Sequence, residues 1–178
     1  MKNLNSIKSL LLMSSIALMS NGAWAGVSCN SLNPRTASTT PASHFSIKDD
    51  GTAVQNATNL MWSRCPVGQS VGAGGVCLGA ASLYHWQGAL NYAQQSEFAG
   101  YSDWRLPNIK ELESIVERQC YSPAFNTQVF GEPSHWGFWS ATPAGSNRSM
   151  LLNTHEGHIS TSSRTGATSG IYLVRDVD

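Results

Sequence analysis

The stretch Gly100-Tyr101-Ser102-Asp103-Trp104-Arg105-Leu106-Pro107-Asn108-Ile109-Lys110-Glu111-Leu112 predicts the point where an extended segment turns into a helix. Pro107 biases Leu106 toward extended backbone because its ring clashes with a helical residue before it. Asn108 is a good helix N-cap, and Glu111 three residues later completes a capping box. We therefore predict an extended segment ending at Leu106 and a helix from about residue 109 to 119.

The residues of this predicted helix have amphipathic spacing. Its apolar stripe consists of Ile109, Leu112, Ile115 and Val116. The polar positions expected to face away from the core are Lys110, Glu113 and Glu117. A second helix is predicted over residues 84–95, where Trp86, Leu90 and Ala93 recur at intervals of four and three.

Short strands are predicted on both sides of the two helices. Alternating or apolar runs bounded by turn residues lie at 44–48, 52–55 and 60–64, and again at 138–140, 150–153, 158–161 and 171–175. The order of strands, then helices, then strands is typical of an α+β domain rather than of a βαβ winding. The sequence contains no internal repeat and no sign of a second domain.

The first 25 residues have the pattern of a signal peptide. Lys2 and Lys8 form a basic start, an apolar run follows, and Ala23-Trp24-Ala25 offers a cleavage site. The apolar run is shorter than the ~20 residues of a membrane span, so we expect no stable span. We predict export to the periplasm, the cell surface or the medium, an extended lead-in over 26–43 and one domain over 44–178.

Charge argues against a nucleic-acid-binding protein. The chain has 11 basic and 11 acidic residues, and cleavage of the signal peptide would remove Lys2 and Lys8. No basic block remains, although non-specific nucleic-acid binding normally needs one.

Four cysteines lie outside the signal peptide: Cys29, Cys65, Cys77 and Cys120. An even number in an exported chain predicts two disulfides, with three possible connectivities. We favour Cys65–Cys77, which would close a Gly-rich loop, and Cys29–Cys120, which would tie the N-terminal segment to the end of the helix predicted over residues 109–119. Zinc is the alternative, but the chain has no Cys-x-x-Cys motif.

A series of short motifs resembles one bacterial family. The series consists of Asp50-Gly51-Thr52, Thr58-Asn59-Leu60-Met61-Trp62, Trp86, the run from Asp103 to Leu112, Trp139-Ser140-Ala141-Thr142 and Leu173-Val174-Arg175. In that order, over about residues 44–175, the chain resembles the Lcl C-terminal domain family, an exported family long catalogued as of unknown function.

The resemblance implies a C-type-lectin-like fold, close to that of the formylglycine-generating enzyme, with N- and C-terminal strands brought together. It also implies an irregular second half that carries ligand contacts. The best-described member type is an adhesin that binds sulfated polysaccharide. This chain departs from that type because it has no collagen-like repeats and its late loops are not basic.

The tryptophans divide into two groups. Trp62, Trp86, Trp104 and Trp139 fall in predicted elements and are expected to be core residues. Trp136 lies in a loop between a proline and a glycine, where its ring could stack on a sugar or anchor the loop. The candidate ligand-binding residues are therefore Trp136, His135, Asn147, Arg148 and His155.

The recognisable run around Trp104 is interpreted as structural. Asp103 and Arg105 are expected to form an ion pair that holds the junction, rather than a ligand clamp. Trp104 and Leu106 are expected to enter the core, while Pro107, Asn108 and Glu111 start the helix.

Catalytic and metal patterns are weak. Glu132-Pro133-Ser134 differs from the calcium and sugar motif of true C-type lectins at its third residue. His155-Glu156-Gly157-His158 lacks zinc-helix spacing and is interpreted as a hairpin tip. Every cysteine precedes Tyr121, whereas the enzyme of the related fold uses a cysteine pair late in its chain. We predict no enzyme activity, no cofactor and no metal.

The sequence favours an exported, monomeric binding module that recognises a surface glycan or a cell-surface protein through loops within residues 122–168. The alternative is a structural or assembly subunit of an envelope or pilus complex.

Overall fold

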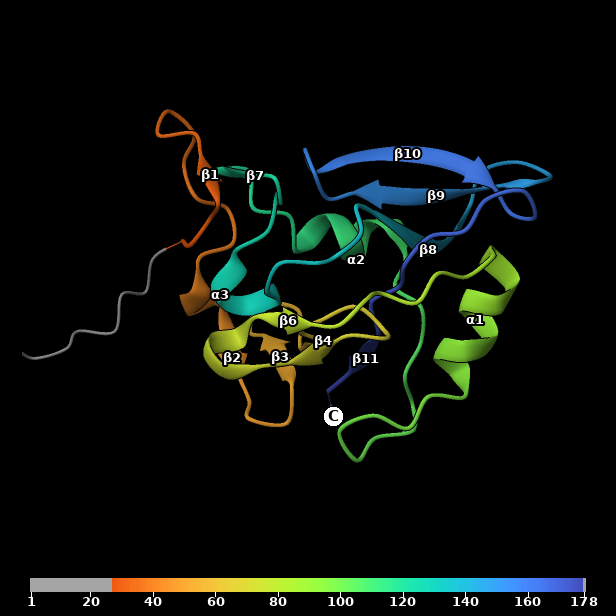
Figure 1. Cartoon of the computed structure of the whole chain (residues 1–178), viewed down its shortest axis with the longest axis horizontal. Coiled ribbons are helices and arrows are strands. Elements are labelled where there is room, and N and C mark those ends of the chain that lie inside the picture. The colour runs from red at the N-terminus through yellow and green to blue at the C-terminus, as the bar shows by residue number, and fades with distance from the viewer. Residues whose placement is uncertain (1–26, 178) are drawn as a thin grey trace, which may run out of the picture.

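The computed structural model describes residues 27–177, which form an α+β domain of short helices and several small antiparallel sheets (Figure 1). The predicted signal peptide lies outside the described residues. No helix within residues 27–177 is long and apolar enough to cross a membrane.

Two sheets form the framework. The first has the strand order β11-β4-β3-β2, with bounds Val174–Asp176, Leu60–Ser63, Thr52–Gln55 and Phe45–Ile47. The second has the order β10-β9-β8, with bounds His158–Ser163, Arg148–Asn153 and Gly137–Pro143. The C-terminal strand thus joins the first strands of the domain in one sheet.

Two-stranded ladders and short helices complete the fold. The ladders pair β1 (Ser31–Leu32) with β7 (Cys120–Tyr121) and β5 (Ser70–Val71) with β6 (Cys77–Leu78). The α-helices are α1 (Trp86–Gln94), α2 (Ile109–Ser114) and α3 (Thr127–Phe130), and the 3-10 turns are η1 (Ala42–His44) and η2 (Ala73–Gly75). The sequence predicted two of these three α-helices and missed the single turn of α3.

The start of α2 confirms the predicted capping box. The Asn108 side chain accepts hydrogen bonds from the backbone N–H groups of Lys110 and Glu111, and the Glu111 carboxylate accepts one from the Asn108 N–H at 2.8 Å. The helix ends at Ser114, however, five residues earlier than predicted.

Glu117 explains the early end of α2, and its predicted outward orientation is wrong. Its side chain is fully buried, and its carboxylate accepts bonds from the Thr39 and Thr40 N–H groups and from the Gln119 N–H. The Ser38 hydroxyl donates another bond at 2.8 Å. A continuing helix would carry this carboxylate away from those donors, so the chain turns instead.

The lead-in at 26–43 is therefore bound to the domain from Ser28 onward. Ser28 accepts from the Thr127 N–H at 2.9 Å, β1 pairs with β7, and residues 38–40 surround Glu117. The disulfide between Cys29 and Cys120 fixes the same segment covalently. Both favoured disulfides are confirmed, since Cys65 is bonded to Cys77.

Three of the four tryptophans expected in the core are buried: Trp62, Trp104 and Trp139. Trp86 is only partly buried, which corrects its prediction. Its indole N–H donates to the Ser140 carbonyl at 2.8 Å, and the Arg164 guanidinium lies over its ring at 4.3 Å. A ring with one apolar face and one cation-covered face suits the edge of a core.

The expected ion pair between Asp103 and Arg105 is absent, because each residue has another partner. Arg105 binds Glu111 and Asp176, and Asp103 accepts a 2.7 Å bond from Arg175 of β11. This hydrogen bond lowers the pKa of Asp103. We call residues 100–112 the signature stretch. Its charged side chains thus connect the start of α2 to the C-terminal strand.

Candidate functional site

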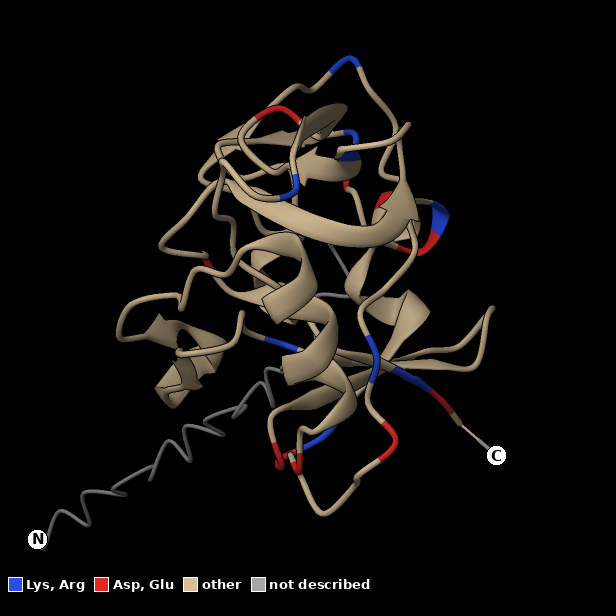
Figure 2. Cartoon of the chain, turned by 90° about the vertical axis from the view of Figure 1, so that its right-hand side faces the viewer, with Lys and Arg blue, Asp and Glu red and all other residues tan. Residues whose placement is uncertain are grey.

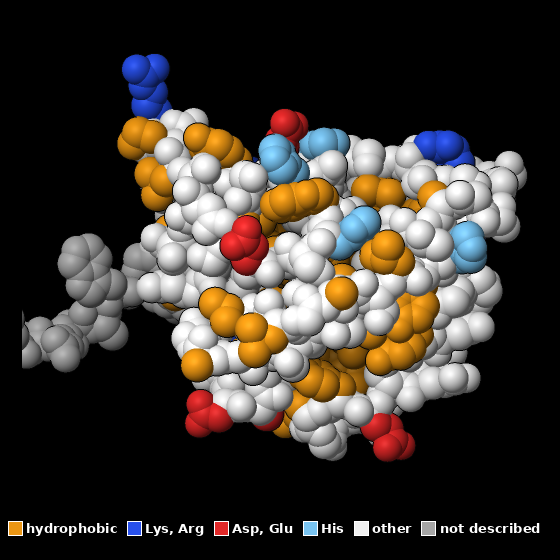
Figure 3. Space-filling view, viewed as in Figure 1, with side chains coloured by type: hydrophobic (Ala, Val, Ile, Leu, Met, Phe, Trp, Pro, Cys, Tyr) orange, Lys and Arg blue, Asp and Glu red, His pale blue; other side chains and the backbone are white. Residues whose placement is uncertain are grey.

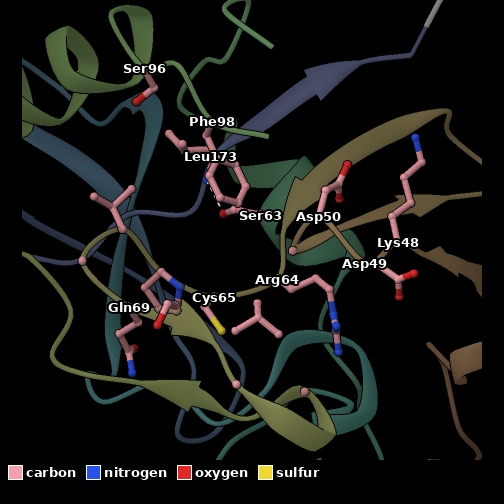
Figure 4. Close-up of a pocket in the computed structure, with 18 of the residues that line it drawn as sticks. Lys48, Asp49, Asp50, Ser63, Arg64, Cys65, Gln69, Ser96, Phe98 and Leu173 are labelled. Atoms are coloured by element: carbon pink, nitrogen blue, oxygen red, sulfur yellow. Dashed lines mark hydrogen bonds between the residues drawn. The ribbon is translucent and has the colours of Figure 1, made fainter. Parts of the chain in front are cut away.

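A cavity of about 740 Å³ opens between three segments of the first half of the chain. These are the turn between β2 and β3, the disulfide-closed loop from Cys65 to Cys77 and the segment that follows α1 (Figure 4). Leu173, just before β11, contributes to the same cavity. A volume of this size lies within the range of about 300–1,000 Å³ found for small-molecule sites.

The Asp49-Asp50-Gly51 turn forms one wall. Asp50 Oδ1 accepts bonds from the Thr52 N–H at 2.9 Å and the Thr52 hydroxyl at 2.6 Å, which fixes the turn. Gly51 has φ +86°, and a Cβ there would lie 3.4 Å from the Phe98 ring. The positive φ therefore favours glycine in this turn, which lies in contact range of the Phe98 ring.

The disulfide loop forms the opposite wall, and Arg64 anchors it. The Arg64 Nε donates to the Val129 carbonyl at 2.8 Å and its Nη2 to the Gln128 carbonyl at 2.9 Å. A Cβ on Gly75 would lie 2.5 Å from that Nη2, so glycine leaves room for the guanidinium. Burial lowers the pKa of Arg64. In Figure 4 this guanidinium points away from Phe98.

The lining of the cavity combines apolar and polar side chains. Apolar lining comes from Phe98, Tyr92, Val67, Val71 and Leu173. Polar lining comes from Lys48, Asp49, Asp50, Gln69 and Glu97. Figure 3 shows a hollow with apolar side chains low on this face and acidic side chains near its edges. A lining that mixes apolar surface with a few polar groups is typical of a binding pocket.

The sulfur atoms beside the pocket are already paired. Both nearby sulfurs are in a disulfide, and residues 27–177 contain no free cysteine. Within the same residues, no three histidine, cysteine or acidic side chains are placed to hold a metal ion together.

The structure brings together some of the candidate ligand residues of the second half. Trp136 is 39% exposed and meets the His155 ring edge-to-face at 5.1 Å between centroids. The His135 ring packs edge-to-face against Phe138, and burial lowers the pKa of His135. Glu156 lies between His155 and His158, on the turn that joins β9 to β10, so the predicted hairpin tip is confirmed.

Asn147 and Arg148 lie apart from that group. Arg148 pairs with Ser163 at one end of the β9–β10 ladder, whereas Asn153 pairs with His158 at the other end, about 17 Å away at the usual rise per residue. The Arg148 guanidinium is bonded to the hydroxyl and carbonyl oxygens of Thr161. The five candidates therefore do not form one surface.

The sequence did not predict this pocket, because its candidate binding loops lie within residues 122–168. Two sequence features do lie in the pocket: the Asp-Asp-Gly turn and the Gly-rich loop closed by a disulfide. Phe98 and Glu97 lie between elements and carry no motif, and the approach of Phe98 to Gly51 depends on the tertiary fold.

Comparison with known proteins gives one family. The family model described as Lcl C-terminal domain matches residues 51–176, from the pocket glycine to the end of β11. No curated protein matches the chain.

Proposed function

The chain belongs to the Lcl C-terminal domain family, and we propose that it is an exported binding module that recognises a surface glycan or protein in an adhesion-type role. The observation that carries this proposal is the pocket beside Gly51 and Phe98. Its walls are held by a disulfide, an anchored arginine and a capped turn, so a ligand would meet a preformed site. Preformed sites lose little entropy when they bind.

Export is part of this proposal. The two disulfides support it, because such bonds persist in oxidising compartments. The signal-peptide pattern before Gly26 supports it as well.

Charge supports a ligand that is not strongly anionic. Figure 2 shows Lys and Arg residues scattered along the chain, with no block of them. The pocket lining contains Asp49, Asp50 and Glu97 beside Lys48 and the carbonyl-bound Arg64. Sulfated polysaccharides normally require clustered cations, and we expect them to bind this domain weakly.

A glycan array together with capture of envelope and host-surface proteins tests the proposal. Ser70 is exposed and lines the pocket, so Ser70→Trp should fill its mouth and abolish capture. Ser146→Trp places the same ring on an exposed loop outside the pocket and should leave capture unchanged. Folded protein that captures nothing in either screen, or whose capture survives Ser70→Trp, would count against the pocket as the binding site.

An assembly role is the second candidate. Val76 and Leu78 are 49% and 53% exposed on either side of Cys77, where the disulfide-closed loop ends. Exposed apolar side chains of this kind suit contact with a protein subunit. Cross-linking in cells that yields one stoichiometric partner, lost in Leu78→Ser but kept in Ser70→Trp, would favour this role over ligand capture.

A further inference from the structure

We propose that the pocket selects a sugar residue that carries a free amino group. This inference rests on the proposed binding function, and it names the ligand chemistry that the pocket fits. Three properties of the lining support it: an aromatic ring held in place, carboxylates that lack ion-pair partners, and a buried hydroxyl group.

The ring of Phe98 is held by the signature stretch. Its centroid lies 5.6 Å from that of Trp104, and the Trp104 indole N–H donates to the Phe98 carbonyl at 2.9 Å. Trp104 is itself buried, so this contact fixes the Phe98 backbone and limits its ring. The flat C–H face of a sugar ring fits an apolar surface made by Phe98 over Gly51 and Val71.

The carboxylates approach the pocket from two elements. Asp49 and Asp50 come from the β2–β3 turn, and Glu97 comes from the segment after α1. None of these three takes part in an ion pair within residues 27–177. Asp50 uses only Oδ1 to bind Thr52, which leaves Oδ2 for a ligand.

The two basic lining residues compensate these charges only in part. Arg64 is directed to the carbonyls of Gln128 and Val129, and Lys48 lies on the same side of the pocket as Asp49 and Asp50 in Figure 4, without an ion pair to either of them in the described part of the chain. An ammonium group beside one of these carboxylates would gain charge-assisted hydrogen bonds, whereas a sulfate there would be repelled.

Ser63 adds a buried hydroxyl group to the lining of the pocket. Only 4% of its surface is exposed, and its hydroxyl oxygen accepts the Leu173 N–H at 3.0 Å. Its hydroxyl proton has no acceptor among the bonds formed by the described part of the chain, so it is available to a ligand oxygen.

A lysine side chain is the competing occupant. It offers one charged tip on a flexible stem and would use the carboxylates, but it presents neither a flat face to Phe98 nor an oxygen to Ser63. An amino sugar uses all three features, and for this reason we favour it.

Isothermal titration of the purified, disulfide-bonded protein tests the inference. The probes are a glucosamine hexamer, its fully N-acetylated form, heparin, and a lysine-containing peptide with its acetyl-lysine counterpart. We expect the glucosamine hexamer to bind at least about tenfold more tightly than any other probe, with affinity falling as salt rises.

Isosteric variants locate the binding. Asp50→Asn combined with Glu97→Gln should weaken binding of the glucosamine hexamer by about tenfold or more, because it removes charge and keeps shape. Glu132→Gln makes a similar charge change at an exposed site outside the pocket and should leave affinity within about twofold.

Each remaining outcome overturns the inference. Equal binding of the N-acetylated hexamer, with no effect of the double variant, would remove the amino-group selectivity. Tighter binding of the lysine peptide would assign the pocket to a protein partner. If no probe binds, amino-sugar selectivity is wrong, while the capture experiment with Ser70→Trp still decides the broader binding function.

Discussion

The Arg105 guanidinium binds the Glu111 carboxylate through both terminal nitrogens, each at 2.8 Å. The same carboxylate accepts the Asn108 N–H that opens α2. Glu111 thus connects helix capping to the extended segment before it, and hydrogen bonding to Glu111 raises the pKa of Arg105. This pair is the structural joint of the signature stretch.

Glu111→Gln should weaken the contact between Arg105 and residue 111 without unfolding the domain. The glutamine amide keeps one oxygen as an acceptor for the Asn108 N–H but loses the bidentate charged pair with Arg105. Because the Arg105 side chain is 38% exposed, we expect the free energy of unfolding to fall by about 1 kcal/mol. Urea unfolding measures the change. Glu113→Gln, which removes only surface pairs, serves as the control, and equal losses in both variants would contradict the account.

Glu117 should make stability depend on pH. Burial acts to raise its pKa, but hydrogen bonds from the Thr39, Gln119 and Thr40 N–H groups and the Ser38 hydroxyl outweigh burial and lower it. The stabilisation that Glu117 supplies is therefore fully present above the pKa of an unfolded glutamate, about 4.3. It is lost as the pH falls through the lower pKa of the folded state.

Glu117→Gln should destabilise the domain at pH 7 by about 2–3 kcal/mol, because the amide places donors against backbone donors. Thermal unfolding measured from pH 7 down to pH 2 should show a smaller acid-dependent fall in Tm for the variant than for the wild type. Parallel pH curves for the two proteins would show that this carboxylate is not the linked group.

Removing the lead-in should unfold the domain, although the family match begins only at residue 51. A chain that starts at His44 lacks Cys29 and the Ser38, Thr39 and Thr40 donors, which leaves the Glu117 carboxylate without most of its partners. We expect the free energy of unfolding to fall by at least about 3 kcal/mol. Circular dichroism of a chain starting at Gly26 provides the control, and an equally stable truncated chain would contradict the role of the lead-in.

Tyr172→Phe should leave stability unchanged or raise it by up to about 1 kcal/mol. The Tyr172 hydroxyl is fully buried without a hydrogen-bond partner in the described part of the chain, and burial raises its pKa. Its removal relieves a desolvation cost. Tyr101→Phe, at a ring covered by Arg175, is the matched control. A loss above about 1 kcal/mol at Tyr172 would reveal a partner for that hydroxyl.

Local sequence signals predicted the features that depend on neighbouring residues. Asn108 and Glu111 determined the start of α2, and the Asp50-Gly51 turn determined the first hairpin. The end of α2 could not be predicted, because Glu117 finds its donors about 77 residues earlier in the chain. The pocket escaped prediction for the same reason: Gly51, Phe98 and Leu173 meet only after the sheets and α1 have packed.

Chemical-shift mapping of bound glucosamine hexamer tests the central claim most directly, since it compares the pocket with the surface of Trp136 and His155 in one experiment. We predict that the amides of Gly51, Phe98 and Gln69 shift on binding, while the Trp136 indole N–H stays unchanged. Shifts at Trp136 and His155, with the pocket amides unmoved, would contradict the account and assign recognition to the β9–β10 turn.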